Sequence, residues 1–179
     1  STASAGSNAW DISANADGSV LAWTEPAGEL YTLCIAANGK VYAPENCWNL
    51  FALYENLESI DFNGVFDTSK VTDMTYMFSL CESLETLDVS SFDTSNVKAV
   101  SAMFSECSSL KGLDLRNFDF QDISKTNQIF EWCTGLKEVK ANKLHIKPVD
   151  VYQNDVKKIK NATVYPYITT SPLLQCKEI

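Results

Sequence analysis

A repeat of 26 residues occupies the middle of the chain and constrains the fold more than any other feature. The copies are LESIDFNGVFDTSKVTDMTYMFSLCES (57–83, one residue longer), LETLDVSSFDTSNVKAVSAMFSECSS (84–109) and LKGLDLRNFDFQDISKTNQIFEWCTG (110–135). LKEVKA begins a fourth copy at 136, and NLFALYENL upstream matches the end of one. Because a single copy cannot bury its own apolar face, the repetition predicts copies that stack around a continuous core.

Each copy divides into two halves with different apolar spacing. The first half carries a pattern such as Leu84, Leu87 and Val89, whose closing alternation predicts a short strand with one buried face. The second half carries residues such as Val100, Met103 and Phe104 at i, i+3, i+4 spacing, which predicts about two helical turns. The Thr-Ser pairs before this stripe are expected to cap the amides of the helix. Strand plus short helix in one repeat predicts an α/β leucine-rich-repeat solenoid, with a short parallel β-sheet and short helices on its convex side.

The chain is expected to have four parts. Residues 1–9 are polar and of low complexity, which indicates a linker or expression remnant. Residues 10–48 contain three β-rich runs (SVLAWT, LYTLCIA and KVYA) and an Asn-Gly turn signal, which predict an N-terminal β-hairpin or three-stranded cap. Residues 49–140 form the leucine-rich-repeat solenoid, with three full coils plus partial ones. Residues 141–179, with runs such as VKKIK and TVYPYI, form a C-terminal β-rich cap.

Composition and charge exclude several classes of partner. Apolar residues make up 45% of the chain and charged residues 21%, as in globular proteins. The net charge is −9, which argues against nucleic acid because phosphate binding needs a basic face. Residues 1–136 hold 6 basic and 19 acidic side chains, whereas residues 137–179 hold 8 and 4. No apolar run approaches the roughly 18 residues of a membrane span, so no membrane insertion is expected in this segment.

The repeated cysteines Cys81, Cys107 and Cys133 raise the question of chemistry. Stacking places them about 5 Å apart, within disulfide range, yet parallel side chains do not turn their Cβ atoms toward one another. A zinc site needs converging ligands, and no histidine shares the register. We therefore favour a structural ladder of buried free thiols over a disulfide or a metal site. A disulfide between Cys34 and Cys47 would close the N-terminal cap; whether Cys34, Cys47 or Cys176 form disulfides is left open.

Polar residues alternate with the apolar residues of the predicted strands, on the face expected to be concave. These candidate partner-binding residues are Ser59, Asp61, Thr86, Asp88, Gly112, Asp114, Glu138 and Lys140. Asp61, Asp88 and Asp114 form a column of like charges, each pair repelling by roughly 1 kcal/mol in water. A second column contains Asp67, Asp93 and Asp119. The carboxylates either accept hydrogen bonds from turn amides or hydroxyls, or stay solvated, or hold calcium, or face a basic or glycan partner.

The stretches LDVSSFDTSNVKAVSAMFSECSSL and FDTSKVTDMTYMF resemble the 26-residue repeat of BspA-like leucine-rich-repeat bacterial surface proteins. The opening WDISANADGSVLAW also resembles the segment that precedes such repeats. The resemblance covers about residues 10–140, and FDFQDISKTNQIF in the third copy departs from it. It implies a secreted or wall-displayed bacterial protein that adheres to host matrix proteins, host cells or other microbes. The signal and the anchor of such a protein are expected outside this segment.

Catalysis has little support in these residues. The only histidine is His145, and no nucleophile elbow, phosphate-binding glycine loop or metalloprotease helix motif occurs. We therefore expect no enzyme, no cofactor and no metal. The sequence predicts an extracellular adhesion module on a bacterial cell surface, which binds a host matrix or cell-surface protein or another microbe. The alternatives are a passive spacer or stalk presenting another domain, and a glycan-binding module.

Overall fold

The computed structural model consists of two compact units, Ser1–Tyr42 and Ala43–Ile179. The structure describes residues 9–11, 19–27, 30–37, 39–120, 122–141 and 163–165.

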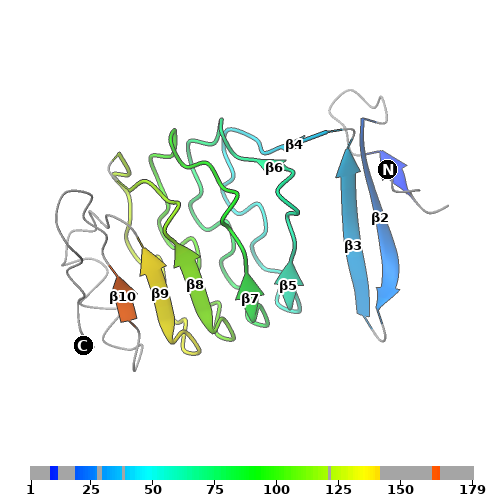
Figure 1. Ribbon diagram of the computed structural model, residues 1–179. Helices are drawn as coiled ribbons and strands as arrows, with labels where there is room; N and C mark the ends of the chain where they lie inside the picture. The colour runs from blue at the N-terminus through cyan, green and yellow to red at the C-terminus, as the bar shows by residue number, and fades with distance from the viewer. Residues whose placement is uncertain are drawn as a thin grey trace. The chain divides into compact units, whose positions relative to one another are not determined.

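The N-terminal unit contains one antiparallel sheet. Strands β1 (Trp10–Asp11), β2 (Val20–Ala27) and β3 (Leu30–Ala37) pair in the order β1-β2-β3. The long hairpin of β2 and β3 is visible in Figure 1, and Trp23 of β2 is 7% exposed. Strand β4 (Val41–Tyr42) ends the unit. The third strand of this sheet is therefore β1, and not the run KVYA.

The second unit begins each copy of the repeat with a short parallel strand. These strands are β5 (Ser59–Ile60), β7 (Thr86–Leu87), β8 (Gly112–Leu115) and β9 (Glu138–Ala141). A further strand, β10 (Thr163–Tyr165), follows the last partial copy. β5 pairs with β7, and β9 pairs with both β8 and β10, as Figure 1 shows. Paired residues are 27, 26 and 25 positions apart in the three ladders. Successive copies thus lie side by side at their strands.

The second half of each copy is a chain of turns. Alternate amides donate to carbonyl oxygens of the next copy, as the Phe78 amide does to Met103 at an N···O distance of 2.9 Å. The amides between them close turns within the copy, as the Met77 amide does to the carbonyl of Met74 at 3.2 Å. A helix needs its amides for bonds to the carbonyl four residues back. In these turn segments, every second amide instead donates to a carbonyl oxygen of the next copy.

Left-handed residues recur at two places in each turn segment. Tyr76 and Leu80 have φ of 56° and 62°, and Ala102 and Glu106 repeat the pair with φ of 52° and 63°. Such residues interrupt a right-handed helix, and side chains other than glycine adopt this conformation at a cost of roughly 1–2 kcal/mol. The network of hydrogen bonds between copies offsets that cost.

The expected α/β leucine-rich-repeat solenoid is therefore wrong. The described residues contain no helix, and the strands of the second unit are two to four residues long and lie in small separate sheets. The apolar stripe is nevertheless buried, since Met74, Met77 and Phe78 are all 0% exposed. A chain of turns can point the same positions inward as a helix does. No described segment is a helix with the length and hydropathy that crossing a membrane requires.

The Thr-Ser pairs do not cap helices. Thr68, which follows strand β6 (Phe66–Asp67), donates its hydroxyl to the carbonyl of Asp93 at 2.9 Å and accepts from the Asp93 amide at 2.8 Å. Thr94 accepts from the Asp119 amide at 2.9 Å. Both threonines are buried and join one copy to the next. The amides of the following serines donate instead to the preceding aspartates.

The core of the second unit lies between the strands and the turn segments. Phe51, Phe78, Phe104 and Phe130 stack in one column, with ring centroids 5.4, 5.8 and 5.8 Å apart and interplanar angles of 16°, 4° and 7°. Each copy supplies one ring. The leucines and valines of the strands close this core from the other side.

Candidate partner-binding face

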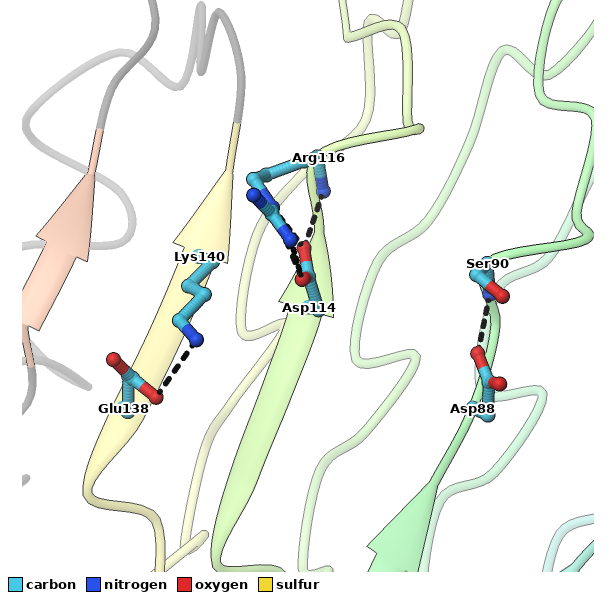
Figure 2. Close-up of polar contacts among 6 residues, drawn as sticks. All are labelled: Asp88, Ser90, Asp114, Arg116, Glu138 and Lys140. Atoms are coloured by element: carbon cyan, nitrogen blue, oxygen red, sulfur yellow. Dashed lines mark hydrogen bonds and ion pairs between the residues drawn. The ribbon is translucent and has the colours of Figure 1, made fainter.

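The predicted partner-binding residues lie on or directly after strands β5, β7, β8 and β9. We call this set (Ser59, Asp61, Thr86, Asp88, Gly112, Asp114, Glu138 and Lys140) the strand face. The parallel registers place Ser59 beside Thr86, Gly112 beside Glu138, and Asp114 beside Lys140. The four members on the first two copies are exposed and the four on the later copies are half-buried. Figure 2 shows Asp88, Asp114, Glu138 and Lys140 in succession along neighbouring copies.

The aspartates that follow β5 and β7 hold the turn after each strand. Asp61 accepts a hydrogen bond from the Asn63 amide at 2.8 Å, and Asp88 accepts one from the Ser90 amide at 2.8 Å. Hydrogen bonds from the Ser90 side chain and backbone lower the pKa of Asp88. Asp88 is therefore ionised at neutral pH. Both carboxylates are exposed and are fixed in direction by the turn amides that they accept.

The second part of the strand face pairs its charges. Arg116 donates from Nε and Nη2 to the carboxylate of Asp114, at 2.9 Å (Nε–Oδ1) and 2.6 Å (Nη2–Oδ2), as Figure 2 shows. The side-chain hydrogen bond from Arg116 lowers the pKa of Asp114, and the charge of Lys140 adds to the effect. Lys140 also lies 3.5 Å from the carboxylate of Glu138. In the expected column of like charges, Asp114 is thus paired with Arg116. Charges without a basic neighbour on the strand face are limited to Asp61 and Asp88.

Sequence reasoning missed Arg116. Its signal was present, since Arg116 follows Asp114 by two positions in LDLRN, the spacing that puts two side chains on one face of an extended chain. The side chains of the Asp114–Arg116 and Glu138–Lys140 ion pairs are between 41% and 60% exposed, so solvent screens both pairs and their contribution to stability is small. They contribute mainly by ordering the polar surface.

Cys81, Cys107 and Cys133 are buried free thiols, one in each copy. Each sulfur donates to the carbonyl oxygen of a phenylalanine one copy earlier: Cys81 to Phe51 (3.0 Å), Cys107 to Phe78 (3.1 Å) and Cys133 to Phe104 (2.8 Å). Burial raises the pKa of Cys81 to about 11, and burial with the neighbouring Cys133 and Cys81 raises that of Cys107. The thiolate that would bind metal or exchange disulfides is therefore scarce at neutral pH.

The reactivity of these thiols tests this arrangement. We expect Cys81, Cys107 and Cys133 to react slowly with a maleimide in the native protein, and rapidly after denaturation. Mass spectrometry of peptides after timed labelling measures each site separately. The half-exposed Cys34 provides the internal control and should label first. Native labelling of Cys107 at the rate of Cys34 would contradict a buried ladder.

The remaining cysteines of the chain are Cys34, Cys47 and Cys176. Cys34 and Cys47 are both free thiols, so the disulfide considered between them is not formed. Cys47 donates instead to the carbonyl of Pro44 at 3.2 Å. Cys176 and His145 lie outside the described residues. Among the residues that are described, no three His, Cys, Asp or Glu side chains group as a metal site requires.

Comparison with known proteins gives one match. A family profile described as "Mycoplasma protein of unknown function, DUF285" matches residues 45–164, a segment that contains the whole strand face and all three cysteines of the ladder. No curated protein and no solved structure matches the chain significantly. Because the match covers about two thirds of the sequence, the chain belongs to the family described as Mycoplasma protein of unknown function, DUF285.

Proposed function

We propose that the chain is a non-enzymatic adhesion module of a BspA-like bacterial surface protein, displayed outside the cell, and that it binds a host protein through the strand face. The resemblance of the repeat to BspA-like proteins supports this proposal, as does the matched family, which is found in such proteins. The observation that carries it is the regular row of polar groups whose directions are set by turns and ion pairs.

A preformed polar row is suited to protein recognition for two reasons. Side chains that are already ordered lose less conformational entropy on binding. Carboxylates with fixed directions also give a partner's basic groups defined positions to meet. Asp61 and Asp88 lie on the part of the row without a basic neighbour among the strand-face residues.

The charge of residues 43–141, which carry the repeats, indicates the kind of partner. Residues 43–141 contain sixteen acidic and seven basic side chains, a net charge of −9. Such a field speeds association with a basic surface and makes the association rate sensitive to salt. We therefore propose a partner with a basic patch, such as an extracellular-matrix or cell-surface protein of the host.

Binding to immobilised matrix and cell-surface proteins tests the proposal. The variant Asp61→Asn/Asp88→Asn removes both charges and keeps an oxygen that accepts the turn amide, so the fold should be retained. We expect it to weaken binding by about tenfold, mainly through a slower association rate.

The matched control is Asp67→Asn/Asp93→Asn. These residues accept turn amides in the same way, at 2.9 Å each, but lie after the strand face in each copy. An equal loss of binding in the control would contradict a role specific to the strand face. No binding by the parent protein across a broad panel would contradict adhesion and favour the spacer role.

A further inference from the structure

A groove crosses four successive turn segments of the second unit, away from the strand face. Its volume is about 340 Å³. Three columns of equivalent residues line it, and the two outer columns consist of the left-handed residues of each segment, such as Tyr76 and Leu80. The middle column contains Ser79 and Ser105, one copy apart. The groove therefore depends on the turn geometry that replaces the expected helices.

The two serines of the middle column have buried hydroxyls without a protein partner. Each of the two residues is only 5% exposed. Their backbone groups are bonded, as when Ser79 donates its amide to Tyr76, but no described residue hydrogen-bonds to either hydroxyl. A buried polar group without a partner costs roughly 1–3 kcal/mol. Two of them at equivalent positions in one groove indicate a site that a ligand with hydrogen-bonding groups completes.

The charges of the groove define the ligand further. Glu106 and Glu131 line it, and no lysine or arginine does. Both are half-buried, and neither forms an ion pair with a described residue. Elsewhere in this unit, acidic side chains such as Glu85 and Asp114 do have a basic partner.

We propose that this groove binds lysine or arginine side chains of an extended peptide segment. The ammonium or guanidinium group donates to the carboxylates of Glu106 and Glu131 and to the hydroxyl oxygens of Ser79 and Ser105. The ring of Tyr76, which is 38% exposed at the edge of the groove, contacts the cation and its aliphatic stem. The site is separate from the strand face, so the molecule has two binding surfaces.

Titration with a synthetic oligolysine peptide, followed by calorimetry and by amide chemical shifts, tests this site. An oligoglutamate of the same length is the control peptide. We expect oligolysine to bind with shift changes centred on Ser79, Ser105 and Glu106, and oligoglutamate not to bind. The variant Glu106→Gln/Glu131→Gln should lower the affinity for oligolysine by about tenfold. Glu82→Gln, an exposed acid outside the groove, should leave the affinity unchanged.

Replacing the two serines should change stability and binding in opposite directions. Ser79→Ala/Ser105→Ala removes two unpaired buried hydroxyls, so the melting temperature of the free protein should rise while its affinity for oligolysine falls. A lower melting temperature would show that the hydroxyls already have partners, and would overturn the proposal. So would shift changes centred on Asp61 and Asp88, because oligolysine would then bind the strand face. Binding of a neutral oligosaccharide to the groove with oligolysine excluded would also overturn it.

Discussion

Phe104→Ala is expected to lower the free energy of unfolding by about 3–5 kcal/mol. Phe104 is 1% exposed, and its ring stacks on Phe78 and Phe130 at centroid distances of 5.8 Å on each side. Removing it leaves a cavity in the centre of the aromatic column and breaks contact with two copies. Because each ring supports the next, the turn segments cannot close the gap without moving their hydrogen bonds. Urea unfolding followed by fluorescence measures the loss.

The matched control for the aromatic column is Tyr54→Ala. Tyr54 is 54% exposed, so its truncation should change the free energy of unfolding by less than about 1 kcal/mol. Equal losses in the two variants would contradict the placement of the Phe104 ring at the centre of the core.

Gly135→Ala is expected to destabilise the protein by about 1–3 kcal/mol. A Cβ atom at Gly135 would lie 2.5 Å from the carbonyl oxygen of Ser108 and 3.3 Å from that of Leu110. Backbone atoms cannot rotate away as a flexible side chain does. The Gly135 amide also donates to the Ser108 carbonyl at 2.9 Å, so relieving the clash disturbs a hydrogen bond between copies. Thermal unfolding of the purified variant measures the effect.

Gly112→Ala is the matched control for this prediction. A Cβ atom there meets nothing closer than the Glu138 carbonyl oxygen at 3.7 Å, an ordinary contact. Alanine also restricts the unfolded chain more than glycine, so this variant should be neutral or slightly more stable. If Gly135→Ala melts at the same temperature as Gly112→Ala, neighbouring copies do not approach each other as closely at Gly135 as the structure shows.

The repeat period identified which residues become neighbours, because equal spacing along the chain becomes stacking in space. The parallel registers bring together Ser59 and Thr86, and Gly112 and Glu138, from different copies. The period does not indicate how the backbone runs between the strands. Burial of Val100, Met103 and Phe104 at i, i+3, i+4 spacing is equally compatible with a helix and with a chain of turns.

The turn segments were unpredictable for a specific reason. Left-handed backbone is usually signalled by Gly, Asn or Asp, whereas here Tyr76, Leu80, Ala102 and Glu106 adopt it. Their conformation is imposed by hydrogen bonds to the next copy, which single-copy propensity does not contain. The groove and its unpaired serines follow from that conformation and could not be found from the sequence.

The candidate strand face was more accessible to sequence reasoning. Alternation in each short strand located its residues, because strand side chains point to opposite faces in turn. The state of each charge was not accessible in the same way. Asp88 accepts a hydrogen bond from the amide of Ser90, whereas Asp114 forms an ion pair with Arg116. The two segments, DVS and DLR, differ in the residue two positions after the aspartate, which is serine in one copy and arginine in the next.

Scalar couplings transmitted through hydrogen bonds in nuclear magnetic resonance test the central claim most directly, which is that alternate amides of the turn segments bond between copies. The most informative amide is that of Phe78, which lies 2.9 Å from the carbonyl oxygen of Met103 in the next copy. The structure predicts a coupling between the Phe78 amide nitrogen and the Met103 carbonyl carbon. A coupling to the carbonyl carbon of Met74, four residues back in the same copy, would show a helix and contradict this account.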